Sequence, residues 1–186
     1  MNYNIVDNAI QNIKTDCFCI PLYENQKLCT QGQALDKLLG QQLSKSIARH
    51  DIDAESGKVF FLSIDSEICN SVILLGLGNA DKLSPAPLNK AFKTLANQAK
   101  TAKVKELTCL FENILIKDAD SSIQVSSQLL RAINDSLYVF DQYKSKKAPL
   151  ATLESVNIAA SKDKHAELVK SCAIAQAQAK GVSITK

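Results

Sequence analysis

Apolar and polar residues follow two periods along this chain. Short apolar runs rich in β-forming residues are separated by longer stretches in which apolar residues recur at helical spacing. Strands that alternate with helices in this way predict an α/β domain, in which a layered sheet is covered by helices. The expected strands lie at residues 3–10, 16–22, 58–64, 72–78, 106–112 and 152–160.

Two of the runs carry information on strand position. The run DCFCIPL, residues 16–22, is apolar at successive positions and is therefore expected to be a central strand, buried on both faces. Pro21 is expected to mark its end, because proline cannot donate to a ladder. The runs KVFFLSI and VILLGLG are separated only by a short polar break, which predicts that they are neighbouring strands.

Three amphipathic helices are predicted between the strands. One helix of about four turns is expected to bury Leu35, Leu38, Leu39, Leu43 and Ile47. Ser84 and Pro85 suit the N-cap and first position of the second helix. The second helix is expected to bury Leu88, Ala91, Phe92, Leu95, Ala99 and Ala102, and the third, introduced by residues 118–122, to bury Leu129, Leu130, Ile133, Leu137 and Phe140.

The last segment, from about Lys162, is rich in alanine and predicts a final helix with Gly181 as a candidate cap. Its contact side would carry Ala, Cys and Leu, and no later element is available to cover it. We therefore expect residues 1–160 to form the α/β domain, residues 161–186 to form a separate helix, and the sequence to be part of a longer protein.

Composition narrows the function classes. The 186 residues are 46% hydrophobic and 22% charged, with a formal net charge of +3. Lysine and arginine are spread along the chain, which argues against a dedicated nucleic-acid groove. No basic leader opens the sequence, and no apolar run approaches the roughly 20 residues that a membrane helix needs. We expect a cytoplasmic protein, whose six cysteines are reduced thiols.

The stretch SVILLGLGNADKLSP is the one segment that resembles a nucleotide-binding turn. A dinucleotide fingerprint needs a third small residue three positions after the second glycine. Gly76 and Gly78 are followed at that place by Asp81, whose carboxylate would repel phosphate, and the helix begins late, near Pro85. The two glycines are therefore interpreted as the turn from a core strand into a surface loop.

Cysteines and histidines do not form a metal motif in the sequence. Cys17 and Cys19 lie two apart, on one side of a strand, but a tetrahedral site needs two further ligands. The other thiols and both histidines are isolated, and no HExxH, GxSxG or GxxxxGK[ST] motif is present. We assign no catalytic, cofactor-binding or metal-binding residue here, and expect the surface-exposed groups to include Cys29, Cys172, His50 and His165.

A basic and aromatic segment follows the third helix. Lys144, Lys146 and Lys147 form a small positive cluster, with aromatic residues at Tyr138, Phe140 and Tyr143. A solvated surface is the simpler interpretation of such a cluster, and contact with phosphate is the alternative.

Three stretches together, TDCFCIPLYEN, VILLGLGNADKLSP and LYVFDQYKSKK leading into LESVNIA, resemble the N-terminal domain of the leucyl aminopeptidases, or cytosol aminopeptidases. The likeness runs from about Asn4 to the final helix. It implies an α/β domain similar in topology to macro domains, followed by a helix that leads into a catalytic domain. In this family the catalytic domain holds two divalent metal ions, manganese or zinc, and releases N-terminal residues from peptides.

The resemblance implies an architectural role for this chain. The expected partners are its own C-terminal catalytic domain and further copies in a hexamer, with peptides as substrates of the whole enzyme, and the chain by itself is expected to be inactive. One alternative is a nucleic-acid-binding module, because some bacterial members bind DNA and exposed lysines could contact phosphates. Those lysines are Lys90, Lys93, Lys100, Lys103 and Lys105, with the cluster at 144–147. The other alternative is an ADP-ribose-binding module.

Overall fold

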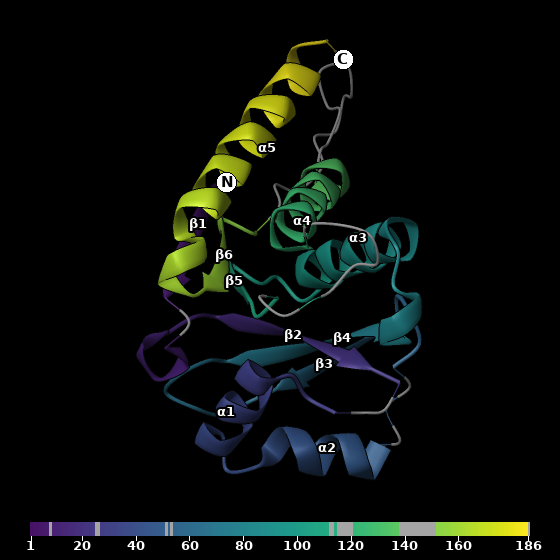
Figure 1. The fold of residues 1–186 in the computed structure, drawn as a ribbon. Helices are drawn as coiled ribbons and strands as arrows, with labels where there is room; N and C mark the ends of the chain where they lie inside the picture. Colours follow the sequence, from purple (N-terminus) through teal and green to yellow (C-terminus); the bar gives the residue numbers. More distant parts are fainter. Residues whose placement is uncertain are drawn as a thin grey trace, which may run out of the picture.

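The computed structural model of the chain describes residues 1–7, 9–24, 27–50, 52, 54–111, 114, 121–137 and 152–185, without the side chains of residues 121–123, 137 and 178–185. Its centre is a six-stranded sheet of order β1-β6-β5-β2-β4-β3 (Figure 1). The sheet confirms all six predicted strands. Their bounds are β1 Asn2–Asp7, β2 Cys17–Tyr23, β3 Val59–Ser63, β4 Ser71–Gly78, β5 Glu106–Cys109 and β6 Ser155–Ala160.

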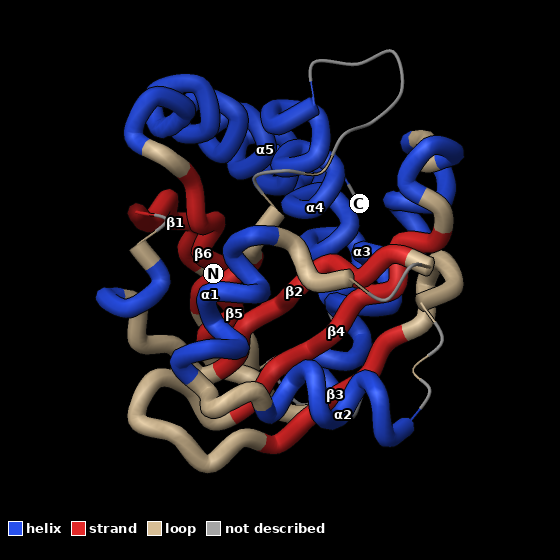
Figure 2. The backbone as a smooth tube through the Cα atoms, turned by 60° about the horizontal axis from the view of Figure 1, so that its bottom comes forward, coloured by secondary structure: helices blue, strands red, loops and turns tan. Residues whose placement is uncertain are grey.

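Helices cover both faces of this sheet. Five of its strands run parallel and β3, at one edge, runs antiparallel to β4. One face packs against α3, α4 and α5, and the other against the shorter α1 and α2 (Figures 1 and 2). The layered α/β architecture is therefore confirmed. The helices are α1 Thr30–Leu38, α2 Gln42–His50, α3 Pro85–Thr101, α4 Ser121–Leu137 and α5 His165–Thr185, with 3-10 turns at Ile10–Asn12, Ala80–Lys82 and Lys162–Lys164.

Strand β2 is central and buried on both faces, as its sequence predicts. Cys17 and Cys19 face α3 and α4, whereas Phe18 and Ile20 face α1 and α2. Pro21 does not end the strand, which continues to Tyr23. The Cys19 carbonyl oxygen accepts from Leu110 N, so the backbone groups of residues 19 and 21 face the β5 side. Strand β5 ends at Cys109, so the N–H that Pro21 lacks would fall beyond the end of that strand.

The single helix predicted from Leu35 to Ile47 is wrong, because the structure has two. Helix α1 ends at Leu38, and Gly40 and Gln41 both take positive φ, of 64° and 60°. Leu38 is 46% exposed. The helical spacing of apolar residues nevertheless continues from α1 into α2, because both helices bury their apolar residues against the same face of the sheet.

Helices α3 and α4 follow their predicted faces. The stripe of α3 is buried from Leu88 to Ala99, although Ala102, just beyond the helix, is only half-buried. Ser84 holds the N-cap position without a side-chain hydrogen bond to the helix, and Pro85 is its first residue. In α4 the inner face is Leu129, Leu130 and Ile133, while the side chain of Leu137 and all of Phe140 lie outside the described residues.

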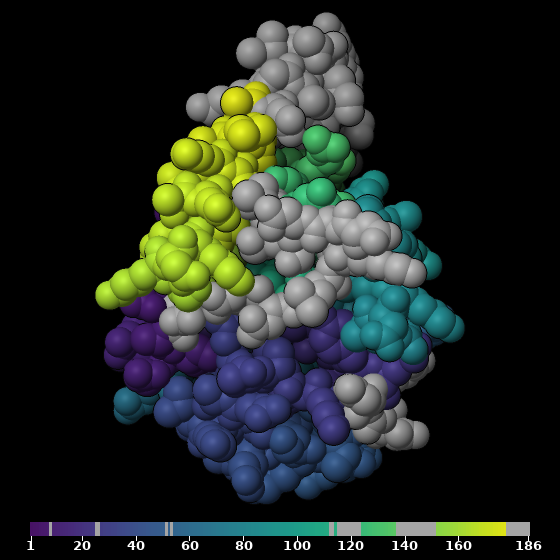
Figure 3. Space-filling view, viewed as in Figure 1, coloured from purple at the N-terminus to yellow at the C-terminus, as the bar shows by residue number. Residues whose placement is uncertain are grey.

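Helix α5 differs from its prediction in two ways. It runs through Gly181 to Thr185, so Gly181 is not a cap. Its contact side is also covered within the chain, since Leu168, Cys172 and Ala175 are buried where α5 packs against α4 and β1. The opposite side of α5 faces outward on the surface of the molecule (Figure 3). It mixes apolar and charged residues: where side chains of α5 are described, the exposed ones are Ala166, Glu167, Val169, Lys170, Ala173, Ile174 and Ala177.

Candidate functional site

Gly76 and Gly78 serve two different structural needs at the carboxyl end of β4. A Cβ at Gly76 would lie 2.9 Å from the Ala54 carbonyl oxygen and closer still to that of Glu55, because this loop packs on the strand. Gly78 has a φ of +74°, which a residue with a side chain adopts only with strain. The turn interpretation therefore holds for Gly78, and Gly76 is needed for close backbone approach.

The region after these glycines differs from a nucleotide-binding turn. A 3-10 turn, Ala80–Lys82, comes before α3, which begins at Pro85 as expected. Asp81 is exposed, and its N–H donates to Asn79 Oδ1 over 2.9 Å within the turn. The helix N-terminus is thus displaced from the glycines, which argues against a dinucleotide site here.

The thiols are mostly buried in the layers beside the sheet. Cys17, Cys19 and Cys109 share the face that packs on α3 and α4, and Cys19 is the register partner of Cys109. Burial raises the pKa of Cys17 to about 12 and that of Cys19 well above the usual value, so neither thiol forms a thiolate near neutral pH. Among the described residues, no three His, Cys, Asp or Glu side chains gather so that they could hold a metal ion.

The two cysteines expected on the surface behave differently from each other. Cys29 is half-buried at the N-cap of α1, where its Sγ accepts from Gly32 N at 3.3 Å, and burial raises its pKa. Cys172 is only 5% exposed, so the expectation of an exposed thiol there is wrong. Helix α5 packs against α4 and β1, and both elements are distant from Cys172 in the sequence.

Neither histidine belongs to a reactive cluster. His50 ends α2 and is exposed. His165 begins α5 and is half-buried, with Nε2 3.2 Å from the Ala160 carbonyl oxygen. The histidines therefore lie at opposite sides of the sheet, each at a helix terminus.

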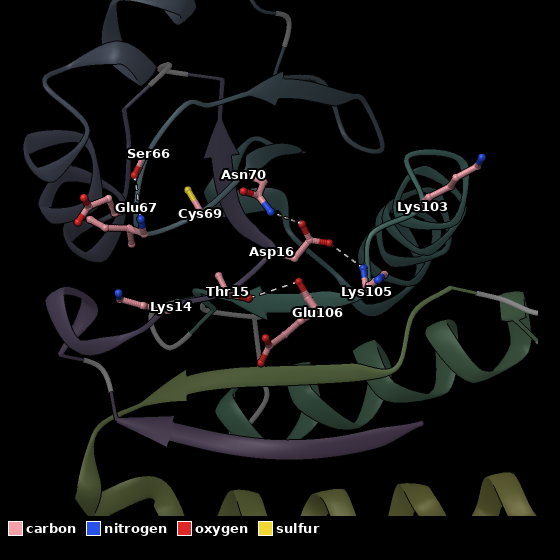
Figure 4. Close-up of a pocket in the computed structure, with 11 residues that line it drawn as sticks. Lys14, Thr15, Asp16, Ser66, Glu67, Cys69, Asn70, Lys103, Lys105 and Glu106 are labelled. Atoms are coloured by element: carbon pink, nitrogen blue, oxygen red, sulfur yellow. Dashed lines mark hydrogen bonds between the residues drawn. The ribbon is translucent and has the colours of Figure 1, made fainter.

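A surface hollow of about 640 Å³ lies at the amino ends of β2, β4 and β5 (Figure 4). Its wall mixes charges of both signs. Lys14 and Lys103 lie at opposite sides of the hollow and do not converge (Figure 4). The lining residues are Lys14, Thr15, Asp16, Ser66, Glu67, Ile68, Cys69, Asn70, Lys103, Lys105 and Glu106.

Asp16 joins the three segments that enter these strands. Its Oδ1 accepts from Asn70 Nδ2 at 3.0 Å and its Oδ2 from Lys105 N at 2.8 Å (Figure 4). Its carbonyl oxygen accepts from Asn70 N and Ser71 N, both at 3.1 Å. A carboxylate committed to these donors holds loops together and is a poor candidate for a base or a ligand.

A row of polar side chains continues from the hollow across the sheet. Thr108 Oγ1 donates to Thr15 Oγ1 at 2.9 Å, and both hydroxyls are buried. Asn157 Nδ2 donates to Glu106 Oε1 at 2.7 Å, and Asn157 Oδ1 accepts from Asn4 Nδ2 at 3.0 Å. These side-chain hydrogen bonds link β1, β6 and β5 to the loop before β2. They therefore help to fix the register of these parallel strands.

Sequence reasoning did not find this hollow, because its members come from three separate segments. The only available signal is that the segments precede three parallel strands, whose amino ends meet at one edge of the sheet. Ligands of open parallel sheets bind at the opposite, carboxyl edge. The hollow is therefore best explained as a structural junction.

The lysines considered for nucleic-acid contact are only partly placed by the structure. Lys90, Lys93, Lys103 and Lys105 are exposed on or after α3, and Lys100 is half-buried. Tyr138, Phe140, Tyr143 and the lysines of 144–147 lie outside the described residues. No described helix is long and apolar enough to cross a bilayer.

Comparison with known families gives one match over most of the chain. A model described as the N-terminal domain of the cytosol aminopeptidase family matches residues 19–147. A probable cytosol aminopeptidase of Pseudomonas fluorescens is 27% identical over 177 residues, which are 95% of this chain and 36% of that protein. The chain thus spans about a third of the length of this relative.

Solved structures give the same result for the fold. A tomato leucine aminopeptidase variant superposes with a TM-score of 0.73 at 19% identity, over 98% of this chain and 36% of that one. The bottromycin maturation enzyme BotP in complex with Mn superposes with a TM-score of 0.55 at 16% identity, over 89% of this chain and 30% of its own. The comparisons give no support to a nucleic-acid-binding or ADP-ribose-binding module.

Proposed function

Because the chain belongs to the cytosol aminopeptidase family, as its N-terminal domain, we propose that it is the non-catalytic part of a metal-dependent leucyl aminopeptidase. The match of the family model over residues 19–147 is the observation that carries this proposal. The complete protein would act in the cytoplasm and release N-terminal residues from peptides. The likeness of its fold to that of a tomato leucine aminopeptidase, over 98% of this chain, supports the proposal.

The metal ions of such an enzyme would be held outside this chain. The described residues include no cluster of acidic, histidine or thiol groups suited to bind one, and Asp16, the best-connected carboxylate of the hollow, is occupied by protein donors. The donor set here does not fit a two-metal centre. We therefore assign hydrolysis to a further part of the protein. In the Pseudomonas fluorescens relative, about two thirds of the length lies outside the region that matches this chain.

The work of this domain would be architectural. Helix α5 buries one side against α4 and β1, and its outer side exposes Val169 and Ile174, at 55% and 58%, beside Glu167 and Lys170. We assign this outer side to contact with the catalytic domain of the same protein, with residues 161–186 as the linking helix. A domain docked there would hold its neighbour in position within the oligomer, for which the hexamer of the family is the expected form.

This assignment is tested by placing charge on the outer side of α5. The double variant Val169→Glu/Ile174→Glu should leave the melting temperature of the 186-residue chain within a few degrees of the wild type, because both side chains are exposed. In the complete protein it should lower the melting temperature and the oligomer mass.

Leu38→Glu is the matched control, since Leu38 is also an exposed apolar residue but lies on α1, on the other face of the sheet. It should leave both the chain and the complete protein unchanged. Equal behaviour of the double variant and the control in the complete protein would contradict the docking assignment.

A further inference from the structure

We draw no further inference here: the strongest candidate, the apolar surface patch along the β3 edge of the described sheet, carries none because nothing in the structure shows what covers it.

Discussion

Tyr3 and Asn134 join the first strand to helix α4, with the Tyr3 hydroxyl donating to Asn134 Oδ1 at 2.5 Å. Burial raises the pKa of Tyr3, so the hydroxyl remains a donor throughout the neutral range. We expect Tyr3→Phe to lower the free energy of unfolding by about 1 to 2 kcal/mol, the cost of a lost hydrogen bond that leaves a half-buried acceptor unpaired. Urea denaturation measures this loss. An unchanged midpoint would contradict a structural role for the bond.

Asp36 fastens the start of α2 to the end of α1. Its Oδ1 accepts from Leu43 N at 2.8 Å and from Ser44 N at 3.3 Å, and its Oδ2 accepts from the Ser44 hydroxyl. Asp36→Ala removes the cap of a helix that begins next to a positive-φ pair, and should destabilise the chain by about 2 kcal/mol. Ser44→Ala, which removes only one of these bonds, should have a smaller effect. Thermal unfolding followed by circular dichroism compares the two variants, and an equal effect of both would exclude the capping role.

Gly76→Ala tests the need for close backbone approach. The added methyl group would meet the backbone of residues 54 and 55, so we expect a loss of about 2 to 3 kcal/mol. Gly40→Ala is the matched control: Gly40 has a φ of +64° but open space where the added methyl group would lie, and should cost only about 1 kcal/mol of backbone strain. Chemical denaturation ranks the pair, and the reverse ranking would contradict the need for close backbone approach at Gly76.

Buried thiols should make the fold sensitive to alkali. Burial raises the pKa of Cys172 to about 11 from an ordinary value of 9.0. Because the folded-state pKa is raised, this contribution to stability is complete below pH 9 and is lost as the pH rises towards 11. The loss is at most about 1.4 kcal/mol per pH unit for one group.

Measuring the free energy of unfolding between about pH 8 and pH 11 checks this dependence. Cys172→Ala should show a shallower decline than the wild type, whatever its stability at neutral pH. Val169→Ala, an exposed change on the same helix, should keep the wild-type slope. Identical slopes for Cys172→Ala and the wild type would contradict the burial of this thiol.

The predicted features that depended on local sequence were confirmed more often than those that depended on distant contacts. The apolar run of β2 and the buried stripe of α3 identify their elements because each pattern lies within a few residues. The exposure predicted for Cys172 was wrong because the elements that α5 packs against, α4 and β1, are remote in sequence. The break between α1 and α2 had a local signal in Gly40, which the continuing apolar spacing concealed.

The hollow at Asp16 had no local signal. Asp16, Asn70 and Lys105 come together only when three parallel strands align their amino ends. Each of these residues is ordinary in its own segment, so neither spacing nor composition marks it. The family resemblance, in contrast, was readable because it rests on contiguous stretches of sequence.

Peptide hydrolysis provides the most direct test of the central claim, that this chain is the non-catalytic domain of a metal-dependent aminopeptidase. The complete protein encoded by the gene and the 186-residue chain are each assayed with a leucyl peptide, with and without added Mn²⁺ or Zn²⁺. We predict release of leucine by the complete protein, lost on chelation and restored by metal, and no release by the chain alone. Hydrolysis by the isolated chain, or a complete protein that remains inactive with either metal, would contradict the account.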